Sequence, residues 1–189
     1  LQENNALAII DIKSAKVTKL VSLGFKDHLL AENGLDPSDR DNAVNIRPWP
    51  VFGMYQPDAI GSYQVGGQTY LVTANEGDAR EYAGFAEESR VSALTLEPTI
   101  FTTDLCGGVC RDNARLGRLT VTRALGQNAS TGRYDALYVL GARSFSIRAA
   151  GGSLVWDSGD QLEQLTKALA NVAFNAGNSG NTADEIGRA

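Results

Sequence analysis

The chain has 189 residues, of which 43% are hydrophobic, which is enough for a sizeable core and too many for a chain that is disordered throughout. Its formal net charge is -5, which argues against nucleic acid as a partner, because phosphate binding requires a basic stripe. No run of about 18 apolar residues occurs, and we therefore expect no membrane-spanning helix. The chain opens at Leu1, without an initiator methionine, on a run typical of a domain interior. We expect a processed or partial chain.

Two hairpins are predicted in the first half of the chain. Apolar and β-branched residues predict paired strands over Asn4–Ile12 and Val17–Leu23. The second pair is predicted over Ala59–Val65 and Thr69–Ala74, on either side of a Gly66-Gly67 turn. Hairpins of this kind indicate antiparallel sheet.

The segments between these strands are long and rich in turn-forming residues. They run over Gly24–Gln56 and Asp78–Gly117, and each contains one short run with helical character, at Lys26–Ala31 and Ala86–Leu94. Long loops inside a compact domain are uncommon and are usually functional or cross a surface. Strand character returns at Arg118–Arg123.

Three more strands are predicted in close succession, over Ala136–Leu140, Ser144–Arg148 and Ser153–Trp156. Glycines separate them, which is typical of an antiparallel meander. Within the last of these strands we expect Trp156 to be a core aromatic residue.

A short helix is predicted near the C-terminus. Asp157-Ser158 can cap its start, and Leu162, Leu165 and Leu169 form one apolar stripe. After Asn171 the composition turns to Asn, Gly, Ser and Asp, which is typical of a loose tail.

The predicted fold class is all-β. About eight strands occur in short antiparallel sets joined by loops, which disfavours a parallel α/β sheet. A β-propeller needs at least about four blades of four strands, and this chain supplies about two. We therefore expect a partial propeller, with residues 1–175 inside one propeller domain and 176–189 as a polar tail or inter-blade loop. The remainder of the propeller would come from the same polypeptide or from a completing chain.

The two cysteines, Cys106 and Cys110, flank a glycine-rich loop. A local disulfide is the favoured interpretation, and two free thiols or a metal site are also compatible with this spacing. A metal site is the least favoured, because there is no second cysteine pair and the only histidine, His28, is distant in sequence. A disulfide would indicate an oxidising compartment.

The strongest candidate site is the loop after the second hairpin. Glu76 and Asp78 flank Gly77, so both carboxylates can approach one point, and Arg80 can pair with either or bind a phosphate. Two interpretations stay open: a ligand or metal site, or an Asx-type turn with a surface ion pair.

Weaker candidates lie elsewhere. Asp36, Asp39 and Asp41 are either hard-cation ligands or a set of turn caps. Asn128 begins a glycosylation sequon, which has meaning in a eukaryotic secretory source. Glu87-Glu88 is interpreted as the solvated start of a helix.

Several segments, in the same order along the chain, resemble the choice-of-anchor I proteins. These are also called mesenchyme-specific cell surface glycoprotein-like proteins, and some members are labelled atypical alkaline phosphatases. The matching segments are Asn33–Asp41, Trp49–Asp58, Thr73–Arg80 and Gly141–Ile147.

The resemblance implies a secreted or surface-anchored protein similar to seven-bladed propellers with long insertions. One turn departs from the family pattern: Gly126–Gly132 has no carboxylate where members often carry an Asp-rich, calcium-loop-like turn.

Three functions follow as hypotheses. The first is a non-catalytic binding or matrix scaffold with an extracellular or surface ligand, since no nucleophile–base motif is present. The second is a metal-dependent, calcium-type phosphoric monoester hydrolase, which the family label implies. The third is a structural subunit completed by another chain. All three place the protein in an extracellular, periplasmic or cell-surface setting.

Overall fold

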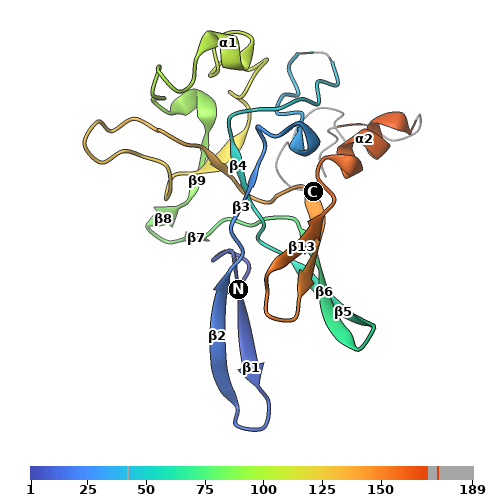
Figure 1. Cartoon of the computed structure of the whole chain (residues 1–189). Coiled ribbons are helices and arrows are strands. Elements are labelled where there is room, and N and C mark those ends of the chain that lie inside the picture. Colours follow the sequence, from blue (N-terminus) through green and yellow to red (C-terminus); the bar gives the residue numbers. More distant parts are fainter. Residues whose placement is uncertain (42, 170–173, 175–189) are drawn as a thin grey trace.

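The computed structural model describes residues 1–41, 43–169 and 174 (Figure 1). Its first element is an antiparallel hairpin of β1 (Ala6–Asp11) and β2 (Lys16–Ser22), with a register shift between Ile9 and Ile10. The hairpin projects from the rest of the molecule (Figure 1). The first predicted hairpin is therefore confirmed.

A five-stranded sheet carries the main core. Its strand order is β3-β4-β11-β10-β9, and only the β4–β11 pair is parallel. The strands are short: β3 (Phe25–Asp27), β4 (Phe52–Met54), β9 (Glu88–Arg90), β10 (Thr120–Thr122) and β11 (Tyr138–Val139). The buried apolar side chains around it include Leu35, Trp49, Val91, Leu116, Val121 and Leu137. The long segments predicted as loops thus build a core of their own.

A four-stranded antiparallel sheet has the order β13-β12-β6-β5. It contains the second predicted hairpin, β5 (Ala59–Val65) and β6 (Gln68–Asn75), turned by two glycines with positive φ. Its other strands are β12 (Ser144–Ala149) and β13 (Leu154–Asp157). In chain order these four strands form a meander into which residues 76–143 are inserted between the second and third strands.

The remaining elements are short. They are η1 (Ala31–Asn33), the small hairpin of β7 (Glu81–Tyr82) and β8 (Phe85–Ala86), η2 (Val91–Ala93), α1 (Thr103–Cys106) and α2 (Gln161–Ala168). None of the helices in the described part of the chain is long and apolar enough to cross a membrane. The mostly-β prediction is confirmed, with several sheets and none of them closed.

Both predicted early helices are wrong. The segment Lys26–Ala31 starts inside β3 and leaves it in a turn, because Lys26 and Asp27 pair with Gly53 and Phe52 of β4. The segment Ala86–Leu94 runs through β9 and η2, since β9 pairs along its length with β10. Tertiary pairing overrides the weak helical periodicity in both places.

Of the predicted three-strand meander near residue 140, the last pair is confirmed as β12 and β13, and the placement of the first strand is wrong. β11 belongs to the five-stranded sheet, where it lies beside β4 and β10, whereas β12 pairs with β6 and β13. Two residues with positive φ, Gly141 at 81° and Arg143 at 51°, mark the change of sheet.

The four-stranded sheet has a polar face that is buried and an apolar face that is not. Register places Thr73, Asn75, Ser144, Ser146 and Arg148 on the first face, and all are buried. The opposite face carries Tyr63, Tyr70, Val72, Phe145, Ile147 and Trp156, none of which is buried. Trp156, expected in the core, is 39% exposed and packs against Phe145 at a ring distance of 5.2 Å.

The C-terminal helix is confirmed as α2, with a different start. It begins at Gln161 after Asp160, and no side chain caps it. The apolar stripe of α2 faces solvent, and Leu165 is 63% exposed. The one buried side chain of α2 is that of Glu163, which is not part of this stripe. The predicted tail, 176–189, lies outside the described residues.

Candidate functional site

The candidate loop follows β6 and is held by Gln56, a fully buried residue with a φ of 38°. The Gln56 side chain donates from Nε2 to the carbonyl oxygen of Asp78 (2.9 Å) and accepts from the backbone N–H of Gly141 (3.1 Å). Its carbonyl oxygen accepts from the N–H of Gly77 (3.2 Å), and its own N–H donates to Oδ1 of Asn5 (3.1 Å). Gln56 thus joins the first hairpin to both loops that resemble family motifs.

Gly77 and Gly141 bring these two loops into backbone contact. Both have positive φ, at 93° and 81°. A Cβ on Gly77 would overlap the backbone of Leu140 and Gly141, and one on Gly141 would overlap the carbonyl group of Glu76. Only glycine allows this approach.

The residue that starts the loop, Asn75, belongs to a buried hydrogen-bond network on the polar sheet face. Its Nδ2 lies 3.0 Å from Oγ of Ser144 and 2.7 Å from Oγ of Ser146. Both serines donate to Oδ2 of Asp157, at 2.8 and 2.7 Å. The hydroxyl of Thr73 donates to Oδ1 of Asn75 at 3.0 Å.

The network ends at a buried lysine. Nζ of Lys26 lies 3.3 Å from Oδ1 of Asp157 and donates to the carbonyl oxygens of Ala142 (3.0 Å) and Gly159 (2.5 Å). Burial lowers the pKa of Lys26, and the attraction of Asp157 acts in the opposite direction. This hydrogen-bond network from Asn75 to Lys26 has a structural role between the two larger sheets. It is not visible in the sequence because its members are far apart in the chain.

Arg80 pairs with neither of the two carboxylates that flank Gly77. Asp78 is exposed, and its Oδ1 accepts from the N–H of Ala79 at 2.8 Å, while Glu76 is half-buried. Arg80 forms its ion pair with Glu87, through Nε to Oε2 (3.0 Å) and Nη2 to Oε1 (3.1 Å). Arg80 therefore forms a bidentate ion pair with a carboxylate that the sequence does not suggest as its partner.

Glu87 is buried, so its interpretation as a solvated helix start is wrong. It accepts from the hydroxyl of Thr122 (2.6 Å) and from the N–H of Arg80 (3.0 Å) as well as from the guanidinium. Burial raises the pKa of Glu87, but the hydrogen bonds from Arg80 and Thr122 outweigh it, and the pKa is lowered overall. The pair fixes the end of the candidate loop on β10.

The second acidic cluster is dispersed into caps and ion pairs. Asp36 is fully buried and accepts from the N–H groups of Asn45 (2.9 Å) and Ser38 (3.3 Å). Asp39 binds Arg118 in bidentate fashion, at 2.9 and 3.2 Å, and Asp41 accepts from the N–H of Ala43 at 3.3 Å. Within residues 1–41, 43–169 and 174, no group of three His, Cys, Asp or Glu side chains is placed to hold a metal ion.

His28 is buried and neutral. Its Nδ1 lies 2.6 Å from the carbonyl oxygen of Asn33, which assigns the proton to Nδ1. Nε2 is buried without a hydrogen-bond partner. Burial and then the charge of Lys26 lower the pKa of His28 to about 3.

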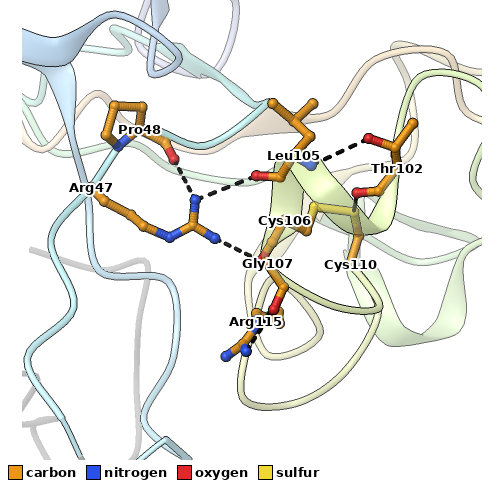
Figure 2. The surroundings of a disulfide bond; sticks show 8 residues. All are labelled: Arg47, Pro48, Thr102, Leu105, Cys106, Gly107, Cys110 and Arg115. Carbon is orange, nitrogen blue, oxygen red and sulfur yellow. Dashed lines mark hydrogen bonds between the residues drawn. A yellow bond between two sulfur atoms is a disulfide. The ribbon is translucent and has the colours of Figure 1, made fainter.

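Cys106 and Cys110 form the disulfide, with a Cα–Cα distance of 5.2 Å, so this prediction is confirmed. The bond closes the turn after α1, whose carbonyl groups face two guanidinium groups (Figure 2). Arg47 donates to the carbonyl oxygens of Leu105 (3.4 Å) and Cys106 (2.6 Å), and Arg115 donates to that of Gly107 (3.0 and 2.8 Å). Cations at a helix C-terminus satisfy the free carbonyls there.

Asn128 stays a prediction as a glycosylation site. Its Nδ2, the atom that would carry a glycan, donates to Oδ2 of Asp135 at 2.8 Å, and its Oδ1 accepts from the N–H of Ser130 at 2.9 Å.

Comparisons with known proteins identify the family. No curated protein and no solved structure matches the chain. A family model described as the choice-of-anchor I domain matches residues 1–188, which is almost the whole chain. Membership fits an extracellular or surface-associated protein, and the disulfide fits the same setting. The chain belongs to the choice-of-anchor I domain family.

Proposed function

We propose that this chain is part of a secreted or cell-surface β-propeller that acts as a binding scaffold. The four-stranded sheet supports the propeller part of the proposal. Strands β5, β6, β12 and β13 lie side by side in the sheet in the order in which they occur along the chain, and all their pairs are antiparallel, which is the strand arrangement of a propeller blade. Residues 76–143 are inserted between β6 and β12.

The single observation that carries the proposal is that this sheet buries its polar face and exposes its apolar face. Its polar face is buried, whereas its apolar face exposes Tyr63, Phe145 and Trp156. Contiguous exposed apolar surface marks an interaction site in a soluble protein. In a propeller, a neighbouring blade would cover such a face.

Footprinting with hydroxyl radicals tests the proposal. Tyr63, Phe145 and Trp156 are expected to oxidise readily in the 189-residue chain and to be protected in a longer polypeptide that contains the further blades. Tyr82, which is exposed on β7 outside this sheet, is the control and is expected to react in both. Equal oxidation of the three sheet residues in both proteins would show that nothing covers the face.

Ligand contact is proposed at Glu76 and Asp78, because their loop is held rigidly by Gln56, Gly77 and the Arg80–Glu87 pair. Calcium binding measured by calorimetry tests a hard-cation ligand. Replacing both carboxylates by alanine is expected to abolish the binding, with Glu81→Ala as the control. Unchanged affinity in the double variant would make Glu76 and Asp78 turn residues.

If the protein is a scaffold, the longer polypeptide that contains the further blades is expected not to hydrolyse p-nitrophenyl phosphate in a reaction that a chelator stops. Turnover that disappears with chelator and returns with metal would replace the scaffold by a phosphoesterase.

A further inference from the structure

Helix α2 is attached to the rest of the protein in an unusual way. An amphipathic helix on a globular protein normally buries an apolar stripe. In α2 the only buried side chain is Glu163, while Leu162 and Leu165 are exposed. One ionisable side chain therefore provides the inward contact of the whole helix.

Two segments distant in sequence hold this carboxylate. Oε2 of Glu163 accepts from the N–H of Asp36 at 2.9 Å. Oε1 lies 2.6 Å from Nε of Arg143 as an ion pair, although it receives no well-aligned hydrogen bond. Arg143 also donates to the carbonyl oxygen of Asp36 at 3.3 Å, so the three residues form one closed contact.

The attraction of the nearby positive charges does not cancel the effect of burial on the pKa of Glu163. Arg143 and Lys26 attract the ionised carboxylate, whereas the buried carboxylate of Asp36 repels it. Burial, the largest effect, raises the pKa of Glu163, and burial also raises the pKa of Asp36. His28 stays neutral above a pKa of about 3 and does not contribute in the range considered below.

We propose that the attachment of α2 to the body of the protein is pH-sensitive and is tighter in mildly acidic solution than at neutral pH. The burial of Glu163 supports this direction: undocking α2 moves the carboxylate from a buried, incompletely hydrogen-bonded position beside the carboxylate of Asp36 into water, where its ionised form is more stable.

The direction follows from proton linkage. A carboxyl group whose pKa is higher in the docked state binds protons more tightly there. Its contribution to docking is fully present below the ordinary glutamate value of 4.5 and is lost as the pH rises through the raised pKa. Asp36, which is buried beside it, changes the attachment in the same direction.

Amide hydrogen exchange of residues 161–168, corrected for intrinsic exchange rates, tests the proposal in the 189-residue chain. The opening equilibrium constant of α2 is expected to fall as the pH is lowered from about 7.5 to about 5, by up to about tenfold per pH unit for each proton taken up. Glu163→Gln keeps the acceptor for the Asp36 N–H and removes the titration of Glu163, so it is expected to reduce the dependence to the part that Asp36 contributes. Glu32→Gln changes an exposed carboxylate near α2 and is expected to keep it.

A second variant protects the test against misfolding. Arg143→Gln removes the attraction that lowers the Glu163 pKa, so it is expected to move the pH range of the transition upward. Amide protection in β6 and β12 verifies that each variant is folded. Exchange of α2 that is independent of pH in the unmodified chain, or an undiminished dependence in folded Glu163→Gln, would overturn the proposal.

Discussion

Lys26 and Asp157 join the two larger sheets of the protein through a buried ion pair, with Nζ 3.3 Å from Oδ1. Lys26 lies in β3 of the five-stranded sheet, and Asp157 ends β13 of the four-stranded sheet. The remaining polar atoms are satisfied by Ser144, Ser146 and backbone carbonyls. The pair therefore specifies how the sheets meet.

Lys26→Met is expected to lower the free energy of unfolding by about 3–5 kcal/mol, because it leaves the Asp157 carboxylate without its cation. Urea unfolding followed by circular dichroism measures this. Lys19→Met changes an exposed lysine of β2 and is expected to stay within about 0.5 kcal/mol of the unmodified chain. A loss below about 1 kcal/mol for Lys26→Met would mean that the pair contributes little to the sheet junction.

Gly77→Ala and Gly84→Ala separate backbone strain from steric overlap. The two glycines have similar φ values, 93° and 88°, but a Cβ meets nothing within 4 Å at Gly84 and meets the backbone of Gly141 at Gly77. Gly84→Ala is expected to cost about 1–2 kcal/mol from its left-handed conformation alone. Gly77→Ala is expected to cost clearly more in the same urea experiment. Equal losses would show that the two loops can separate without penalty.

Local features of the fold were predictable from sequence, and long-range ones were not. The first hairpin follows from its apolar and β-branched residues, the second from the glycines of its turn, and the disulfide from a four-residue separation. The pairing of β12 with β6 was missed because the inserted segment, residues 76–143, separates strands that are adjacent in the sheet. Apolar side chains are normally expected in the interior. This expectation fails for Trp156, which lies on the exposed apolar face of the sheet, because the sheet buries its polar face instead.

The candidate site shows the same limit. Carboxylates close in sequence, such as Asp36, Asp39 and Asp41, looked like one cluster, yet each has its own backbone or arginine partner. Glu87 is misassigned to solvent from the sequence because its environment is created by Arg80 and by Thr122, which lies on another strand. Only the pairing of β9 with β10 brings these residues together.

Replacing both Cys106 and Cys110 by serine is expected to lower stability by about 2 kcal/mol, since the disulfide closes a short loop and restricts the unfolded chain only modestly. Arg47 and Arg115 still bind the carbonyls of the turn, so we expect the variant to fold. Intact mass with and without reductant and alkylation verifies the bond, and urea unfolding gives the loss. Alkylation of the unmodified chain without reductant would disprove the disulfide.

His28 provides a prediction for acid solution. Its pKa is lowered from 6.5 to about 3, so the unfolded chain binds a proton that the folded chain does not bind between these values. The stability due to neutral His28 is present above about pH 6.5 and is lost as the pH falls, at about 1.4 kcal/mol per pH unit.

Glu163 and Asp36 act in the opposite direction, because their pKa values are raised, so the effect must be measured as a difference. We expect the stability advantage of the unmodified chain over His28→Gln to shrink by about 2 kcal/mol between pH 7 and pH 5. Because His28 is the only histidine, its ring proton resonance in NMR spectra is unambiguous and reports the same property directly. In the folded chain this resonance should not titrate between about pH 7.5 and pH 4.5, whereas a midpoint near the ordinary value of 6.5 would show that the ring reaches solvent.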